Sequence, residues 1–170
     1  ERENKVETRL KCSIGSRPIY KLEVLLPNGF DVEEVVVPGT FDWAITTADD
    51  QQLLTVYLAA GAIGSLDVDL RGTVLRDTGG PRDPNGPVAG PRFDVKNTAR
   101  QSGFIGVQVD PSVDVAVASS ENIESVSLGQ VTSWLAASQR SLARLVIAFR
   151  SADFNVAFQT IQREARVNSI

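Results

Sequence analysis

The sequence lacks histidine and methionine, and its 170 residues include one cysteine, Cys12. Without histidine the chain lacks the most frequent general base and the most frequent metal ligand of proteins. One thiol and no imidazole also argue against zinc, haem and iron–sulfur sites. A single cysteine forms no internal disulfide, so the cysteine count leaves the redox compartment open.

Long apolar runs are also missing. No stretch approaches the roughly 20 apolar residues of a membrane-spanning helix, and no signal peptide is visible. Positive charge is scarce, since 17 Lys and Arg stand against 21 Asp and Glu and give a net charge of −4. We therefore expect no nucleic-acid partner and no direct membrane insertion by this segment. Because the chain opens on Glu1 without methionine, we expect it to be processed or part of a longer polypeptide.

Short runs of alternating apolar and polar residues dominate the first half of the chain. Residues 6–14 and 20–26 alternate with a period of two, which predicts half-buried strands. Asn28-Gly29 favours a turn, because both residues accept a positive φ. We also expect a tight turn at Gly15-Ser16. The repetition of such runs and breaks predicts an all-β fold with an antiparallel, sandwich-like architecture.

Residues 77–92 interrupt this pattern with four proline and four glycine residues. Proline and glycine at this density are incompatible with a helix or a central strand. The sequence thus predicts a β-sandwich-like domain at 1–76, a linker or loop at 77–91, and a second β-domain at 92–170. The alternative is one large sandwich over residues 1–170, with the same segment as a loop.

Residues 131–149 are ambiguous. They form either one amphipathic helix, or one or two helical turns at 132–139 followed by a buried strand at 142–149. The continuous apolar run at 145–149 favours the second interpretation. We expect at most one short helix in the chain, near Trp134.

A family resemblance rests on the strand residues Tyr20, Leu22, Val24 and Leu26 with Pro27 and Gly29, then 32–37, Trp43, 54–58 and 66–70, and in the second half 103–107 and 148–150. This order resembles a β-module of very large, uncharacterised envelope proteins of planctomycete-like bacteria. The resemblance covers most of the chain and consists of strand and turn residues. It implies a segment of a long extracytoplasmic β-protein, in the periplasm or cell envelope, and carries over no catalytic residue.

Trp43 and Trp134 are the candidate ligand-binding residues, as stacking platforms for sugars, although a single tryptophan on an apolar strand is usually part of the core. The candidate metal ligands are Asp67, Asp69, Asp77 and Asp83, whose carboxylates offer the hard oxygens that calcium prefers. Asp67 and Asp69 share one strand face and can equally face solvent. Calcium is the only cofactor that we consider.

Enzymatic signals are poor. Asp77-Thr78-Gly79 matches the aspartic-protease tripeptide, but that chemistry needs two carboxylates, and Arg76 stands where an apolar residue belongs. For a glycosidase, the sequence does not place Glu33-Glu34 near Glu121 or Glu124. We expect no enzyme. The leading hypothesis is a structural or protein-interaction module of a larger extracytoplasmic bacterial protein, which contacts neighbouring domains or a protein partner. The alternative is a carbohydrate-binding or calcium-dependent adhesion module, and a hydrolase comes last.

Overall fold

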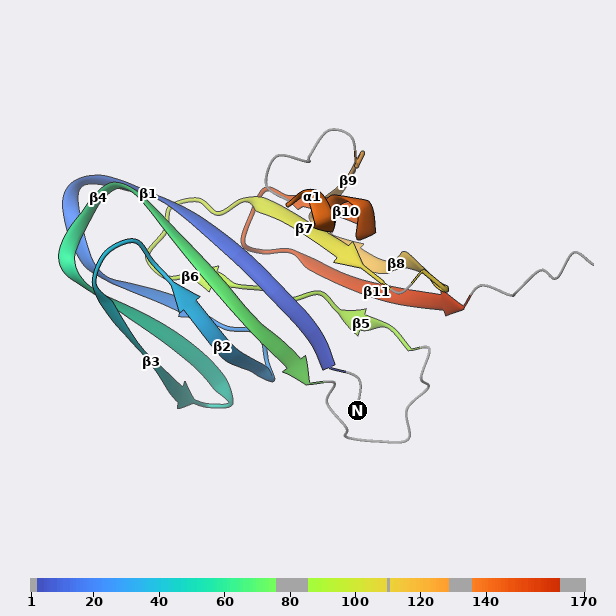
Figure 1. Cartoon of the computed structure of the whole chain (residues 1–170), viewed down its shortest axis with the longest axis horizontal. Helices are drawn as coiled ribbons and strands as arrows, with labels where there is room; N and C mark the ends of the chain where they lie inside the picture. Colours follow the sequence, from blue (N-terminus) through green and yellow to red (C-terminus); the bar gives the residue numbers. More distant parts are fainter. Residues whose placement is uncertain (1–2, 76–85, 110, 129–135, 163–170) are drawn as a thin grey trace, which may run out of the picture. The chain divides into compact units, whose positions relative to one another are not determined.

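The computed structural model describes residues 3–75, 86–109, 111–128 and 136–162 (Figure 1). These residues form antiparallel strands and one short helix, α1 (Ala137–Leu142), which confirms the all-β prediction. The chain divides into two compact units. The first comprises Glu1–Gly80 and Pro91–Thr98, and the second comprises Pro81–Gly90 and Ala99–Ile170.

The first unit is built on two long strands that pair along most of their lengths. Its strands are β1 (Glu3–Leu25), β2 (Phe30–Val36), β3 (Phe41–Ala48), β4 (Gln51–Leu75) and β6 (Asp94–Val95). The β1–β4 ladder runs from the pair Glu3–Leu75 to the pair Leu25–Leu53. β3 pairs with the first part of β4, β2 pairs with its last part, and β6 pairs with the end of β1.

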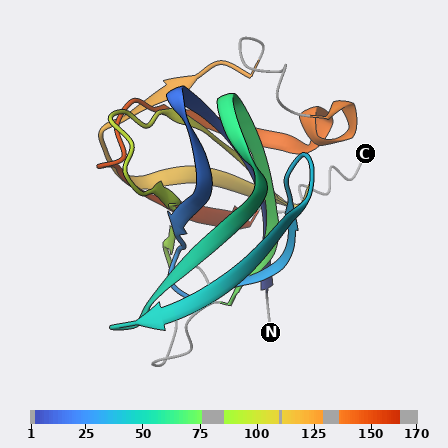
Figure 2. The same cartoon turned by 90° about the vertical axis from the view of Figure 1, so that its left-hand side faces the viewer.

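The β1–β4 ribbon bends sharply in its middle (Figures 1 and 2). Between the pairs Ile14–Gly64 and Ile19–Ala62, β1 advances by five residues and β4 by only two. Between the pairs Ile19–Ala62 and Lys21–Tyr57, β1 advances by two residues and β4 by five. Extra residues in one strand of a pair bend it, and here the two shifts cancel, so that the original register resumes. The predicted tight turn at Gly15-Ser16 was therefore wrong, because these residues lie inside β1.

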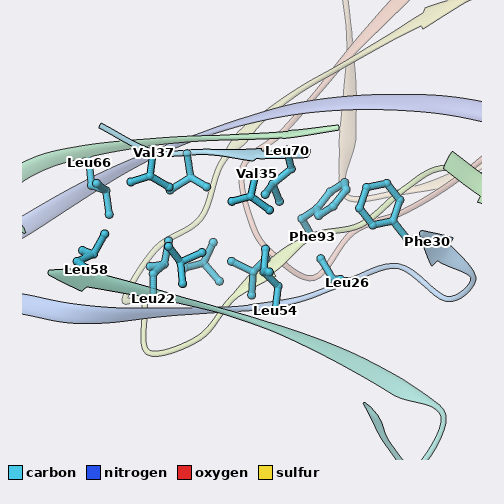
Figure 3. Packing of buried hydrophobic residues seen from close by; sticks show 14 residues of the cluster. Leu22, Leu26, Phe30, Val35, Val37, Leu54, Leu58, Leu66, Leu70 and Phe93 are labelled. Carbon is cyan, nitrogen blue, oxygen red and sulfur yellow. The ribbon is translucent and has the colours of Figure 1, made fainter. Parts of the chain in front are cut away.

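Bending brings the two halves of the ribbon face to face around the core of the first unit. Figure 3 shows Leu22, Leu26, Leu54 and Leu58 on one side of this core, and Val35, Val37, Leu66 and Leu70 on the other. Phe30 and Phe93 meet edge to face, with ring centroids 5.2 Å apart. Burying one Val, Leu or Phe side chain contributes about 1.5–3 kcal/mol, so this cluster is the main stabilising element of the unit.

Two turns of the first unit follow from local sequence. The predicted turn at Asn28-Gly29 is present, with φ of 72° at Gly29 and a hydrogen bond of 3.1 Å from the Phe30 N–H to the Pro27 carbonyl. Asp49 and Asp50 connect β3 to β4 with φ of 51° and 62°. Asp tolerates this left-handed conformation better than most residues, which suits a tight hairpin.

The unit boundaries differ from the predicted ones. Phe93 and Val95 are buried in the core of the first unit, whereas the prediction placed the second domain from residue 92 onwards. Val88–Ala89 forms β5, which pairs with a strand of the second unit, inside the predicted linker 77–91. Residues 76–85 lie outside the described part of the chain. Strands of two residues carry no readable periodicity, so the sequence did not assign them.

In its described residues, the second unit contains two three-stranded antiparallel sheets, in the orders β7-β10-β9 and β5-β11-β8. Its other strands are β7 (Gly103–Gln108), β8 (Val113–Glu121), β9 (Ile123–Val126), β10 (Ala143–Phe149) and β11 (Asn155–Gln162). Residues from both sheets share one core: the buried members are Ile147, Phe154, Val156 and Phe158. Phe149 and Phe154 stack at 4.3 Å between ring centroids. This unit is therefore a small sandwich.

Residues 136–149 show the predicted order of a short helix followed by a buried strand. α1 ends at Leu142 and β10 begins at Ala143, with Val146 and Ile147 fully buried. The continuous apolar run thus belongs to a central strand rather than to a helix. Of the predicted helix at 132–139, residues 132–135 lie outside the described part, as does Trp134.

Candidate functional site

Trp43 lies on β3, and its half-buried side chain packs against the core of the first unit. Its indole therefore contributes to packing, and only part of the ring is accessible to a ligand. Trp134, the other predicted platform, lies outside the described residues. The structure therefore offers no paired tryptophan platform in the ranges that it describes.

Asp67 and Asp69 lie on the outer face of β4, opposite basic residues of β1. The register pairs Asp67 with Lys11 and Asp69 with Arg9. The Arg9 guanidinium donates two hydrogen bonds to the Asp69 carboxylate, of 2.7 and 3.2 Å, and this contact raises the pKa of Arg9. Among the described residues, no three His, Cys, Asp or Glu side chains form a group that could hold a metal. Asp77 and Asp83 lie outside them.

Two of the glutamates considered for a hydrolase, Glu34 and Glu124, form exposed ion pairs. Arg71 contacts Glu34 at 3.1 Å and Glu7 at 4.0 Å, while Glu124 contacts Arg150 at 3.1 Å in the second unit. Pairs of this kind contribute little to stability and are typical of solvated sheet surfaces. The aspartic-protease tripeptide 77–79 lies outside the described residues. No observed contact brings the glutamates of a glycosidase together in the described residues.

Cys12 lies half-buried on the inner face of β1. Burial raises the pKa of its thiol above the ordinary value, and the negative charge of Asp67 raises this pKa further. A raised pKa lowers the fraction of thiolate, which is the reactive form. The position therefore suits a packing role for Cys12.

Two exposed tyrosines lie beside the bend of the ribbon. Tyr20 is 60% exposed and Tyr57 is 49% exposed. The Tyr20 ring covers Gly61, since a Cβ at Gly61 would lie 3.0 Å from its Cζ atom. Lys21 pairs with Tyr57 in the ladder, and its Nζ contacts Glu23 at 2.8 Å. From the sequence these tyrosines carry less signal than the two tryptophans, and the pairing of Tyr57 with Lys21 becomes visible only in the register of β1 and β4.

The remaining feature is the outer edge of β3, which in the described residues pairs with β4 alone. The Thr40 carbonyl accepts a hydrogen bond of 3.0 Å from the Ala59 N–H of β4. Because backbone groups alternate along a strand, the odd residues of β3 turn their N–H and C=O groups away from β4. The Trp43 N–H bears this out, since it donates to the Asp42 carboxylate at 2.8 Å instead of to β4.

Comparisons of the chain with protein-family models, with curated proteins and with solved structures gave no match. Within the described ranges, no helix combines the length and the apolar character required to cross a membrane. The functional argument therefore rests on the residues of this chain.

Proposed function

We propose that this chain is a non-enzymatic structural or protein-interaction module of a larger extracytoplasmic bacterial protein, and that it contacts neighbouring domains or a protein partner. The outer edge of β3 is the observation that carries this proposal. Sheet edges present backbone donors and acceptors in a row, which another polypeptide can pair with. The exposed ion pairs support the non-enzymatic part of the proposal, because an arginine contacts each of the carboxylates of Asp69, Glu34 and Glu124.

The size and location of the native polypeptide test this function. An antibody raised to this segment should detect a band far above the 18.3 kDa of the chain, in the envelope fraction of bacterial cells that produce it. A cytoplasmic band near the mass of the segment would refute the proposal, because it would leave no larger extracytoplasmic protein for the module to serve.

A carbohydrate-binding module is a second candidate, and the exposed ring of Tyr57, which pairs with Lys21 in the ladder, favours it. Aromatic faces flanked by polar groups such as Lys21 and Glu23 suit sugar rings, which present C–H groups and hydroxyls together. Titration with soluble polysaccharides should then show binding that Tyr57→Ala weakens and Tyr57→Phe retains, because phenylalanine keeps the ring. Unchanged binding in Tyr57→Ala, or no binding by the unmodified protein, would eliminate this candidate.

A further inference from the structure

Besides the two-residue strand β6, the described part of the first unit has three sheet edges, which differ in how they discourage pairing with other chains. β1 carries Lys5, Glu7, Arg9 and Lys11 at alternate positions, and β2 has a register break between Val32 and Glu34. Charges and bulges are the usual devices that protect sheet edges. β3, by contrast, pairs with β4 through eight successive residues without a break, and Asp42 is its only charged residue. β3 is therefore the edge best prepared to receive another strand.

The side chains of β3 also favour addition of a strand. Phe41, Trp43 and Ile45 pack against the core of the first unit but remain half-buried, because the sheet ends at this strand. A neighbouring strand would cover the accessible part of this row with its own apolar side chains. Removing that apolar surface from water is favourable, at about 25 cal/mol per Å².

Asp42 determines the charge that such a strand should carry. Its carboxylate now accepts the outward-facing N–H of Trp43. An added strand would present a carbonyl to the Trp43 N–H and so release the Asp42 carboxylate from this hydrogen bond. The carboxylate would then lie beside the residue of the added strand that faces Asp42. This residue belongs to a non-hydrogen-bonded pair, in which facing side chains approach most closely. If β3 paired with the β3 of a second copy, that strand would offer no cation to Asp42. A Lys or Arg on a different strand would neutralise the Asp42 carboxylate.

From these observations we infer that β3 binds an extended segment of a partner protein by strand addition. The segment alternates apolar residues, which extend the row of Phe41, Trp43 and Ile45, with polar residues that include a Lys or Arg facing Asp42. The outward backbone groups of residues 41, 43, 45 and 47 form the ladder. This inference rests on the proposed function and specifies the contact site and the partner's chemistry.

A short acetylated peptide that alternates Val and Thr around one Lys tests this site by isothermal titration calorimetry. The unmodified protein should bind it about tenfold more tightly than the same peptide with Glu in place of Lys. Because the chain has a net charge of −4, a scrambled Lys peptide of the same composition controls for general attraction. Equal affinity for ordered and scrambled peptides would overturn the inference.

Two variants and one control variant locate the site. Thr47→Pro removes an N–H that faces away from β4, a position where an edge strand tolerates proline, and should weaken binding about tenfold. Thr47→Val keeps the N–H and should bind as the unmodified protein does. Asp42→Lys should reverse the preference and select the Glu peptide, and this variant tests the site without introducing a proline into β3. Equal binding by Thr47→Pro and Thr47→Val, or an unaltered preference in Asp42→Lys, would refute the site.

Other outcomes separate this inference from the proposed function. A dimer that forms in sedimentation velocity without peptide and is lost only in Thr47→Pro would replace the basic partner by a second copy of the chain. No peptide binding together with a large envelope polypeptide would overturn the β3 site and leave the module function intact. Specific peptide binding together with a small cytoplasmic polypeptide would do the reverse.

Discussion

Gly72 on β4 offers the sharpest test of how the bent ribbon is packed. It pairs with Val6 of β1 and with Val32 of β2. A Cβ added at Gly72 would collide with the backbone oxygen of Asp31 and would lie 2.7 Å from Cζ of Phe30. The ring cannot withdraw easily, because Phe30 is 1% exposed and meets Phe93 edge to face. Both a ring and a backbone segment must move to accommodate one methyl group.

Overpacking of a core typically costs about 1–3 kcal/mol, and we expect Gly72→Ala to reach the upper end of this range. Gly15→Ala is the matched control, because nothing lies within 4 Å of a Cβ at this position of β1. The control should leave the free energy of unfolding unchanged or raise it by about 0.4–1 kcal/mol, since alanine restricts the unfolded chain more than glycine does.

Urea unfolding, followed by the fluorescence of Trp43 in a Trp134→Phe background, would measure this difference in the first unit. Combining Gly72→Ala with Phe30→Leu should cost less than the sum of the two single changes, because the smaller side chain removes one collision. If Gly72→Ala unfolds at the same urea concentration as Gly15→Ala, the close approach of β2 to β4 at Gly72 is wrong.

Further predictions concern the second unit and the thiol. Ile147→Ala should cost about 2–5 kcal/mol because Ile147 is 0% exposed, whereas Ile161→Ala, at 54% exposure, should change urea stability by less than about 0.5 kcal/mol. Asn122 has φ of 57° and its amide donates to the Asp153 carbonyl at 2.7 Å, so Asn122→Ala should lower the melting temperature more than Asn122→Gly; the reverse order would contradict a left-handed residue there. Burial raises the pKa of Cys12, so the folded state favours the neutral thiol. The resulting stability is complete below the ordinary thiol pKa and is lost as pH rises through the folded pKa, a loss that Cys12→Ala should abolish in urea unfolding between pH 8 and about pH 10.

Local signals made much of the architecture predictable. Alternation identified the strands at 6–14 and 20–26, and Asn28-Gly29 identified the turn that precedes β2. The continuous apolar run at 145–149 was correctly interpreted as a buried strand. In each case the residues that carry the signal lie within one element, so the pattern and its physical cause are both visible in a short window of sequence.

The bend was not predictable by the same means. Gly15-Ser16 looks like a turn because glycine and serine favour turns. These residues stay inside β1 because the extra residues of β1 at the bend are matched by extra residues of β4, a strand that begins only at Gln51. The two-residue strands β5 and β6 were missed for a related reason, since only their pairing partners make them strands.

The candidate sites likewise combine features that local sequence predicts with features that depend on distant strands. Asp67 and Asp69 were placed correctly on one strand face, but Arg9, which engages Asp69, lies 60 residues away in the sequence. No local pattern connects these residues, so the ion pair between Arg9 and Asp69 could not be predicted from the sequence. The outer edge of β3 was likewise invisible, because an edge is defined by the pairing that a strand lacks.

The discontinuity of the first unit has a consequence for synthesis on the ribosome, where the chain emerges from its N-terminus. β1 emerges first and remains without its ladder until β4 has left the tunnel, since the pair Glu3–Leu75 spans almost the whole first unit. Phe93 and Val95 follow only after β5, whose partner β11 comes much later. The first unit thus completes its core only after β5 has emerged, so the second unit begins to leave the ribosome before the first can finish folding.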